Sequence, residues 1–198
     1  MLYVCHNGKE LTVDAEGFHH LGALVAAQLQ NMNGHVLTRL WVDEREINEE
    51  ELERLETLSL TGVESVRLES ESAREVALKV LKSSAEYAGA VRVHLEEIAT
   101  LLRRGKLDTA NQLLADSCDA LSVLVHSITG AAAQLNKDTE EIQKITSELT
   151  PWLKALVAAQ EESDWVRVAD YLEFEVAPQL EHWQRVCRSA SDDRMVKE

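Results

Sequence analysis

The residues of this chain whose types suggest metal chemistry lack the partners that such chemistry needs. Glu16 and His19 form a single Glu-x-x-His spacing, whereas a di-metal carboxylate bundle needs two such motifs and two further carboxylates. Zinc ligands are usually separated by two to five residues, but Cys5–His6 and His19–His20 are adjacent pairs. Neighbouring residues of a strand point to opposite faces, so we expect a half-buried Cys5 beside a solvated His6. The sequence therefore predicts no metal site.

Nucleophilic and nucleotide chemistry also lack support. A catalytic cysteine needs an activated thiolate close to a histidine. Cys118 lies beside an apolar helical stripe and is expected in the core. His94 follows Val91 by about one turn, which predicts a packed edge residue. The patterns G-x-S-x-G, G-x-x-x-x-G-K-[ST] and G-x-G-x-x-G do not occur. We predict no catalytic residue and no cofactor, and the balance favours a protein that is not an enzyme.

Composition limits the partners. The chain has 198 residues, 45% of them hydrophobic, with two prolines and a formal net charge of −15. This apolar share supports a packed core, and the scarcity of proline suits helices. The negative charge would repel phosphate backbones and anionic lipid headgroups, so we expect no nucleic acid and no membrane as partners. The densest basic group, Arg103, Arg104 and Lys106, is typical of the last turn of a helix.

The location of the protein is predicted from its first residues and its cysteines. MLYVCHNGKE has no basic stretch followed by an apolar run, which argues against a signal peptide. No apolar stretch approaches the roughly 18 residues of a membrane span. Cys5, Cys118 and Cys187 are odd in number and far apart, as expected of free thiols in a reducing compartment. We therefore predict a cytoplasmic protein.

The elements that must position these residues differ between the two parts of the chain. Residues 1–71 alternate short β-type runs with helical segments. In order these are the strands 2–5 and 11–13 around Asn7-Gly8, an amphipathic helix ending before Gly34, a strand over 35–42, a short acidic helix capped by Asn48 and Glu51, and a strand over 63–68. Val36, Thr38, Leu40 and Val42 are expected to share one face of their strand.

This order of strand, strand, helix, strand, short helix and strand resembles the β-grasp, or ubiquitin-like, superfamily. The resemblance covers residues 1–71 and depends on the element order and on the Asn7-Gly8 turn. It implies a β-grasp domain built from these six elements, a fold that often serves as a binding platform. The diglycine tail used for conjugation in that superfamily is absent, since Leu68 is followed by ESES and then a helix. A conjugated modifier is therefore not expected.

From Ser72 onward the chain predicts only helices. A capping box at Ser72 and Glu75 begins a helix that runs to about Arg104. Its expected apolar stripe consists of Val76, Val80, Ser84, Tyr87, Val91, Leu95, Ile98 and Leu102. Three further helices are predicted to begin at caps and to be broken or restarted at prolines: one from Asp108 to about Asn136, one from Asp138 with Thr150-Pro151 inside it, and one from Ser163 or Asp164 with Pro178 inside it.

Short connections force neighbouring helices to run antiparallel. The sequence thus predicts an α+β protein, with a small β-grasp-like domain over 1–71, an antiparallel bundle of about four helices over 72–190 and a frayed tail over 191–198. No repeat at a solenoid period is visible in the printed sequence.

Two aromatic residues stand out as possible binding residues. Trp41 alternates with Arg39 and Asp43 on the strand face opposite Val42. It is a binding anchor if that face is exposed, and it joins the two domains if it packs against the long helix. Phe174 falls opposite the core stripe of the last helix, so either a second surface covers it or Pro178 changes the helix phase.

The acidic residues are concentrated in the first domain. Up to Glu71 there are fourteen Asp or Glu against five Lys or Arg. Glu49, Glu50 and Glu53 lie in the most acidic run, VDEREINEEELERLE. This run is either a solvated helix face or a docking surface for a basic partner segment.

The hypothesis that follows is a non-enzymatic protein-interaction module: an adaptor, an assembly factor or a chaperone-like protein. Its partner would be a protein, offering a basic or a helical segment, to the acidic face or to grooves of the bundle. Trp41, Phe174, Glu49, Glu50 and Glu53 are the candidate contact residues. Self-association into a homo-oligomer is also open. The alternative is an enzyme or small-ligand binder with a site between the two domains.

Overall fold

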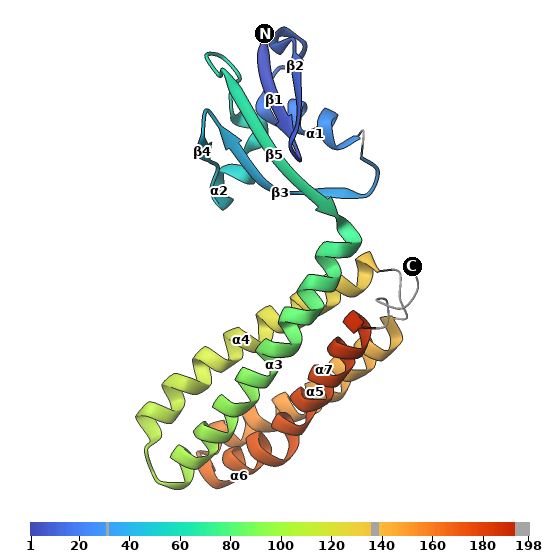
Figure 1. Ribbon diagram of the computed structural model, residues 1–198. Coiled ribbons are helices and arrows are strands. Elements are labelled where there is room, and N and C mark those ends of the chain that lie inside the picture. The colour runs from blue at the N-terminus through green and yellow to red at the C-terminus, as the bar shows by residue number, and fades with distance from the viewer. Residues whose placement is uncertain (31, 136–138, 193–198) are drawn as a thin grey trace. The chain divides into compact units, whose positions relative to one another are not determined.

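The protein is α+β and consists of two compact units. The computed structural model describes residues 1–30, 32–135 and 139–192. The first unit is Met1–Glu75 and the second is Val76–Glu198. The first holds a five-stranded sheet and the second holds helices (Figure 1). The fold class predicted from the sequence is confirmed.

The sheet is mixed. Its strands are β1 (Leu2–His6), β2 (Lys9–Val13), β3 (His35–Val42), β4 (Arg45–Glu46) and β5 (Ser65–Ser72). They lie in the order β2-β1-β5-β3-β4. β1 and β5 are parallel, and the other neighbouring pairs are antiparallel. The last strand of the unit therefore lies in the middle of the sheet, next to the first.

Two tight turns join adjacent strands. Asn7 and Gly8 have φ angles of 48° and 78°, so the β1–β2 connection is a hairpin turn with two left-handed residues, as predicted. Asp43 and Glu44 have φ angles of 46° and 68° and make the same kind of turn between β3 and β4. The short strand β4 was not predicted, because its turn contains neither Asn-Gly nor Asp-Gly.

The shared face predicted for β3 is wrong in its first half. A register irregularity lies between Leu37 and Arg39. It shifts the alternation, so Leu37 packs against the core and Val36 is exposed. After the irregularity Leu40 is buried and Val42 packs on the core, as predicted.

Short helices cover the core face of the sheet. They are η1 (Ala15–Gly17), α1 (Leu21–Gln30), α2 (Glu49–Leu52) and η2 (Leu55–Thr57). Leu21, Leu24 and Val25 of α1 are buried against the apolar side chains of β1, β3 and β5. The predicted capping box of α2 is present: Asn48 Oδ1 accepts from Glu51 N–H, and the Glu51 carboxylate accepts from Asn48 N–H.

The second unit consists of four rods, three of which are single long helices. They are α3 (Ala73–Arg103), α4 (Leu107–Gln134), α5 (Thr139–Glu161), and the continuous run of α6 (Trp165–Asp170), η3 (Tyr171–Val176) and α7 (Ala177–Asp192). Figure 1 shows the rods packed side by side. Short connections join α3 to α4 and α5 to α6. This arrangement is the antiparallel bundle that the short connections predict.

Local hydrogen bonds explain where the rods begin and end. Ser72 and Glu75 form the predicted capping box of α3. At its other end Gly105, with φ of 70°, lets Lys106 N–H bond to Leu101 O and Gly105 N–H to Leu102 O. α4 begins at Leu107 without a side-chain cap, so the cap predicted at Asp108 is wrong.

The two prolines have different effects. Pro151 lies inside α5, which continues through it, so no restart occurs there. Pro178 follows the π-helical turn η3, in which Ala177 N–H bonds to Leu172 O, five residues back. A proline cannot donate to the carbonyl four residues earlier and clashes with it. The wider π turn relieves this conflict and changes the helix phase near Phe174.

The bundle core is formed by aliphatic residues with one central tryptophan. Trp183 is 1% exposed and donates its indole N–H to Ile145 O at 3.3 Å. The rings of Trp152 and Tyr171 pack at a tilt of 45° with centroids 6.0 Å apart, and Trp165 is partly buried on the core. The helix start predicted at Asp138 and most of the predicted tail 191–198 lie outside the described residues. None of the described helices combines the length and apolar character needed to cross a lipid bilayer.

Candidate functional site

The best-formed cluster of chemical groups in the first unit surrounds Ser70. Its hydroxyl lies 2.7 Å from His6 Nε2 and 3.3 Å from His35 Nδ1. Asn7 donates to Ser70 O and accepts from Ser70 N–H, at 3.0 and 2.8 Å. His6 is 7% exposed, so the prediction of a solvated histidine is wrong. Burial, followed by the nearby His35, lowers the pKa of His6.

This cluster has the hydrogen bonds of a nucleophile and base, but not their access. Ser70 is 6% exposed, and no carboxylate within hydrogen-bond distance orients the His6 ring among the described residues. The hydrogen bonds of Asn7 to Ser70 instead link the end of β1 to β5. The arrangement is that of a buried structural network.

The other candidate residues, Cys118, His94 and Cys187, lie on three different helices. Cys118 is exposed on α4, and His94 is exposed on α3, so the buried and packed positions predicted for them are wrong. Cys187 is fully buried, and burial raises the pKa of its thiol to about 12. Within the described ranges no three His, Cys, Asp or Glu side chains are placed to hold a metal ion.

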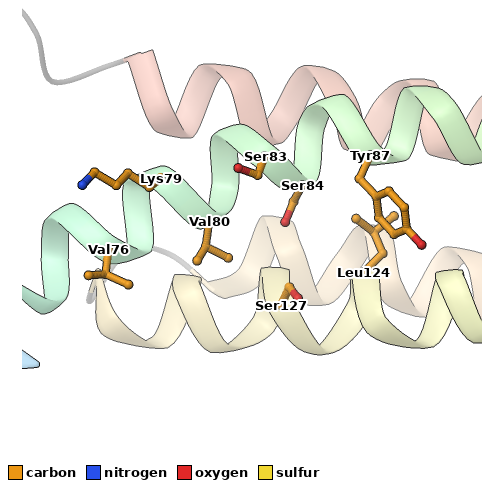
Figure 2. Close-up of a pocket in the computed structure, with 8 residues that line it drawn as sticks. All are labelled: Val76, Lys79, Val80, Ser83, Ser84, Tyr87, Leu124 and Ser127. Carbon is orange, nitrogen blue, oxygen red and sulfur yellow. The ribbon is translucent and has the colours of Figure 1, made fainter. Parts of the chain in front are cut away.

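A groove of about 370 Å³ lies between α3 and α4. Figure 2 shows Val80, Ser84 and Tyr87 of α3 facing Leu124 and Ser127 of α4 across this space. Val76 extends the same side toward the start of α3. The lining is thus an aliphatic and aromatic surface with serine hydroxyls among its members.

Over the first half of α3 most of the buried residues are not those predicted. Most of the predicted residues there stay partly exposed and line the groove. The buried line there is Ala77, Leu81, Ala85 and Ala88. Val76 and Val80 are only half-buried, and Tyr87 is 41% exposed. Both lines have helical spacing, and the prediction from the sequence favoured the line with the larger residues. Ala77, Ala85 and Ala88 fall on one helical face, and small residues there indicate close packing on that face.

The spacing along α3 sets the size of this surface. Tyr87 follows Val76 by eleven positions, about 16 Å at the helical rise, and Val80 lies between them. Lys79 and Ser83 line its α3 side, and Ser84 is 5% exposed at its floor. An apolar strip three helical turns long, with hydroxyl groups, suits side chains of a helix lying along it.

A second apolar groove lies on the other side of α4. It has a volume of about 270 Å³ and lies between α4 and α5. Its lining is mostly aliphatic and includes Leu121, Val125, Leu149 and Leu153, with Cys118 at the surface. Partial burial, and secondarily Asp119, raise the pKa of Cys118, which disfavours a reactive thiolate.

The predicted contact residue Trp41 is covered by arginine. It is 8% exposed, with the Arg67 guanidinium carbon 3.8 Å and that of Arg39 5.7 Å from the ring centroid. Its strand partners are Arg67 on β5 and Glu46 on β4. The ring therefore lies on the outer sheet face but is not freely available there.

The predicted contact residue Phe174 is 61% exposed in η3. The π turn before Pro178 therefore does not bring it into the core. Arg103 lies 5.8 Å from its ring and forms ion pairs with Asp170 and Glu173. Phe174 is a single apolar side chain surrounded by charges, not part of a groove.

The acidic candidates Glu49, Glu50 and Glu53 are exposed at α2. Glu53 lines a hollow together with Glu56 and α1 residues. The five predicted contact residues therefore lie on different elements of the two units. Glu53 belongs to the α1–α2 surface, Trp41 to the sheet and Phe174 to the bundle.

Comparison with known proteins concerns mainly the bundle. The model of a family described as domain of unknown function (DUF8042) matches residues 79–186, which is more than half of the chain. The chain belongs to this family. The match spans α3 from Lys79 through most of α7 and so includes the lining residues of both helical grooves except Val76.

The chain is also similar to a protein of Treponema pallidum (strain Nichols) whose name reads "Uncharacterized protein". The two are 29% identical over 163 residues, which cover 80% of this chain and 80% of the relative. The aligned length exceeds the family match, so the similarity is not confined to the bundle. No solved structure matches this chain.

Proposed function

We propose that this protein is a non-enzymatic protein-interaction module, whose α3–α4 groove receives an amphipathic helix of a partner protein. The observation that supports it is the partly exposed apolar strip of Val76, Val80 and Tyr87. This strip lies beside the buried line of Ala77, Leu81, Ala85 and Ala88. Helical grooves bind partner helices through apolar side chains at i, i+3 and i+4. The strip is three helical turns long, which is enough to contact two or three such side chains of a partner helix.

Two broader proposals accompany it. The N-terminal unit belongs with the β-grasp superfamily, supported by the strand order β2-β1-β5-β3-β4 with β1 and β5 parallel. The protein works in the cytoplasm, supported by three cysteines of which none is in a disulfide. Adaptor, assembly-factor and chaperone-like roles all fit this proposal.

Photo-crosslinking tests the groove. Tyr87 is replaced by p-benzoylphenylalanine in the full-length protein, and Val93, which is 51% exposed on α3 but outside the groove, is replaced in the control. We expect position 87 to capture a discrete polypeptide from an extract of the cells that produce the protein. Mass spectrometry should locate the crosslink in an amphipathic helical segment.

A matched pair of substitutions then measures affinity for a synthetic peptide of that segment. Val80→Ser should weaken binding about tenfold, because the serine removes an apolar contact of roughly 1.5 kcal/mol, whereas Val93→Ser should not. Equal weakening by both would contradict the groove. Capture of a second copy of this chain would identify self-association, and a co-purifying small molecule in native mass spectra would replace the helix proposal.

A further inference from the structure

The first unit carries an apolar groove of its own, between α1 and the α2–η2 segment. It has a volume of about 380 Å³. Ala23 and Ala26 line one side, and Leu52 and Leu55 line the other. Both leucines are half-buried, so part of each side chain packs on the sheet core and part faces the groove.

Small residues of α1 create this groove. Gly22 allows the η2 backbone to approach closely, since a Cβ there would lie 3.2 Å from Glu56 N. His20 has a fixed orientation, because its Nδ1 accepts from Ala23 N–H at 3.1 Å. The ring proton is therefore on Nε2, which leaves a donor at this end of the groove.

The rim of the groove is acidic. Glu53 and Glu56 line it directly, and Glu49 and Glu50 precede them in α2. Within the described part of the chain none of these four carboxylates forms an ion pair. The nearby Glu51 differs, because Arg45 binds it through two hydrogen bonds of 2.9 and 3.0 Å.

The segments that form the groove contain few cations. The α1 segment Leu21–Gln30 contains no charged residue. Arg54 is the single Lys or Arg between residues 46 and 66 of the sequence. The negative potential at the rim is thus left for a partner to neutralise.

We propose that this groove binds a short basic peptide segment that places an aliphatic side chain between α1 and α2 and its Lys or Arg side chains on the glutamate rim. The proposal deepens the proposed function, because it names a partner chemistry for a second surface of the same interaction module. Apolar contact with Leu52 and Leu55 supplies affinity, and the rim selects for positive charge.

Peptide titration of the ¹⁵N-labelled full-length protein tests it. The probe is the acetylated and amidated hexapeptide KLKKLK, with ELEELE and KSKKSK as comparisons. We expect KLKKLK to shift the amide signals of Gly22, Ala23, Ala26, Leu52 and Leu55, and the shifts to shrink as salt is added. ELEELE should cause none. Equal shifts with KSKKSK would overturn the apolar part of the proposal.

Charge-matched variants locate the site. Glu53→Gln with Glu56→Gln should weaken KLKKLK binding about threefold to tenfold, as expected for two exposed ion pairs. Glu16→Gln with Glu64→Gln removes the same charge from exposed positions elsewhere in this unit and should leave the affinity within about twofold. Similar losses in both double variants would show attraction to net charge alone and would overturn the site.

Ala26→Trp provides a variant that keeps the charge and fills the groove. Ala26 is exposed, so the fold should tolerate the larger side chain, which the dispersion of the spectrum verifies. Binding of KLKKLK should be lost, and retained binding would overturn the proposal. Val80→Ser in the bundle should leave this titration unchanged, so failure of the peptide here and failure of the α3–α4 groove are separate results.

Discussion

Four residues other than glycine adopt left-handed backbone conformations in the described chain: Asn7, Asp43, Glu44 and Ser163. Such a conformation costs about 1 kcal/mol or more for a residue with a Cβ. Asn7 and Asp43 offset it with side-chain bonds, since Asn7 binds Ser70 and Asp43 Oδ1 accepts two backbone N–H groups. Ser163 forms no side-chain hydrogen bond to the described residues.

Ser163 therefore offers a test of backbone strain. It occupies the position after α5 where Asp164 N–H bonds to Ala159 O and Ser163 N–H to Gln160 O. Gly105 has the same role after α3, with φ of 70° against 57° at Ser163. We expect Ser163→Gly to raise the free energy of unfolding by about 1 kcal/mol, because glycine adopts this conformation without steric cost.

The reciprocal change is the control. A Cβ at Gly105 would meet no atom within 4 Å, so Gly105→Ser should cost about 1 kcal/mol through the backbone alone. Urea denaturation of both variants measures the change in midpoint, with the slope unchanged. Midpoints that move in the same direction would show that backbone conformation does not determine the change in stability at these two positions.

At the scale of elements, the junction of β1 and β5 depends on one histidine. His6 is buried against Ser70, and burial and His35 lower its pKa below the ordinary 6.5. The unfolded chain therefore binds a proton at His6 more readily than the folded chain does. The contribution to stability is complete above the unfolded pKa and decreases as the pH falls through 6.5 toward the folded pKa.

We expect the first unit to lose stability between pH 7.5 and 5.5 for this reason. Urea titrations followed through the amide signals of β1 and β5 measure the loss at both pH values. His6→Gln keeps a donor near Ser70 but removes the titration, so its loss should be smaller than in the natural chain. His19→Gln, at an exposed position, should behave like the natural chain. An unchanged loss in His6→Gln would assign the pH dependence to other groups.

Elements with local signals were the ones predicted correctly. The Asn7-Gly8 turn and the capping boxes at Asn48 and Ser72 each depend on residues within four positions of one another. The π turn at 171–176 and the irregularity after Leu37 depend on how a helix or strand fits its neighbours. The Ser70 cluster needs β1 and β5 paired across 64 positions, which periodicity in a single sequence does not specify.

The candidate grooves could not be predicted from the sequence for a related reason. The line Val76–Val80–Tyr87 and the buried line Ala77–Leu81–Ala85–Ala88 beside it both have the periodicity of a buried face. The packing of the neighbouring helices decides between them. In the first unit the acidic run was recognised, including Glu53. Its significance as the rim of an apolar groove follows from Gly22, where the approach of η2 to α1 shapes the hollow.

At the scale of the whole molecule, each unit has its own hydrophobic core. The core of the first unit includes Leu68, which is fully buried between β1 and β3 in the sheet. The core of the second unit is a separate cluster that includes Leu95 and Trp183. Since the two clusters share no residue, the stability of each unit should depend mainly on its own side chains.

A cavity in one core should therefore leave the other unit stable. We expect Leu68→Ala to lower the unfolding free energy of Met1–Glu75 by about 2–5 kcal/mol, the usual cost of truncating a buried leucine. Hydrogen exchange measured by mass spectrometry should then show faster exchange in β1, β3 and β5, while peptides of α4 and α7 keep their protection. Leu95→Ala should produce the reverse pattern in the same measurement. If either substitution accelerated exchange equally in both units, the two cores would be one cooperative unit, and the domains could not act as separate binding modules.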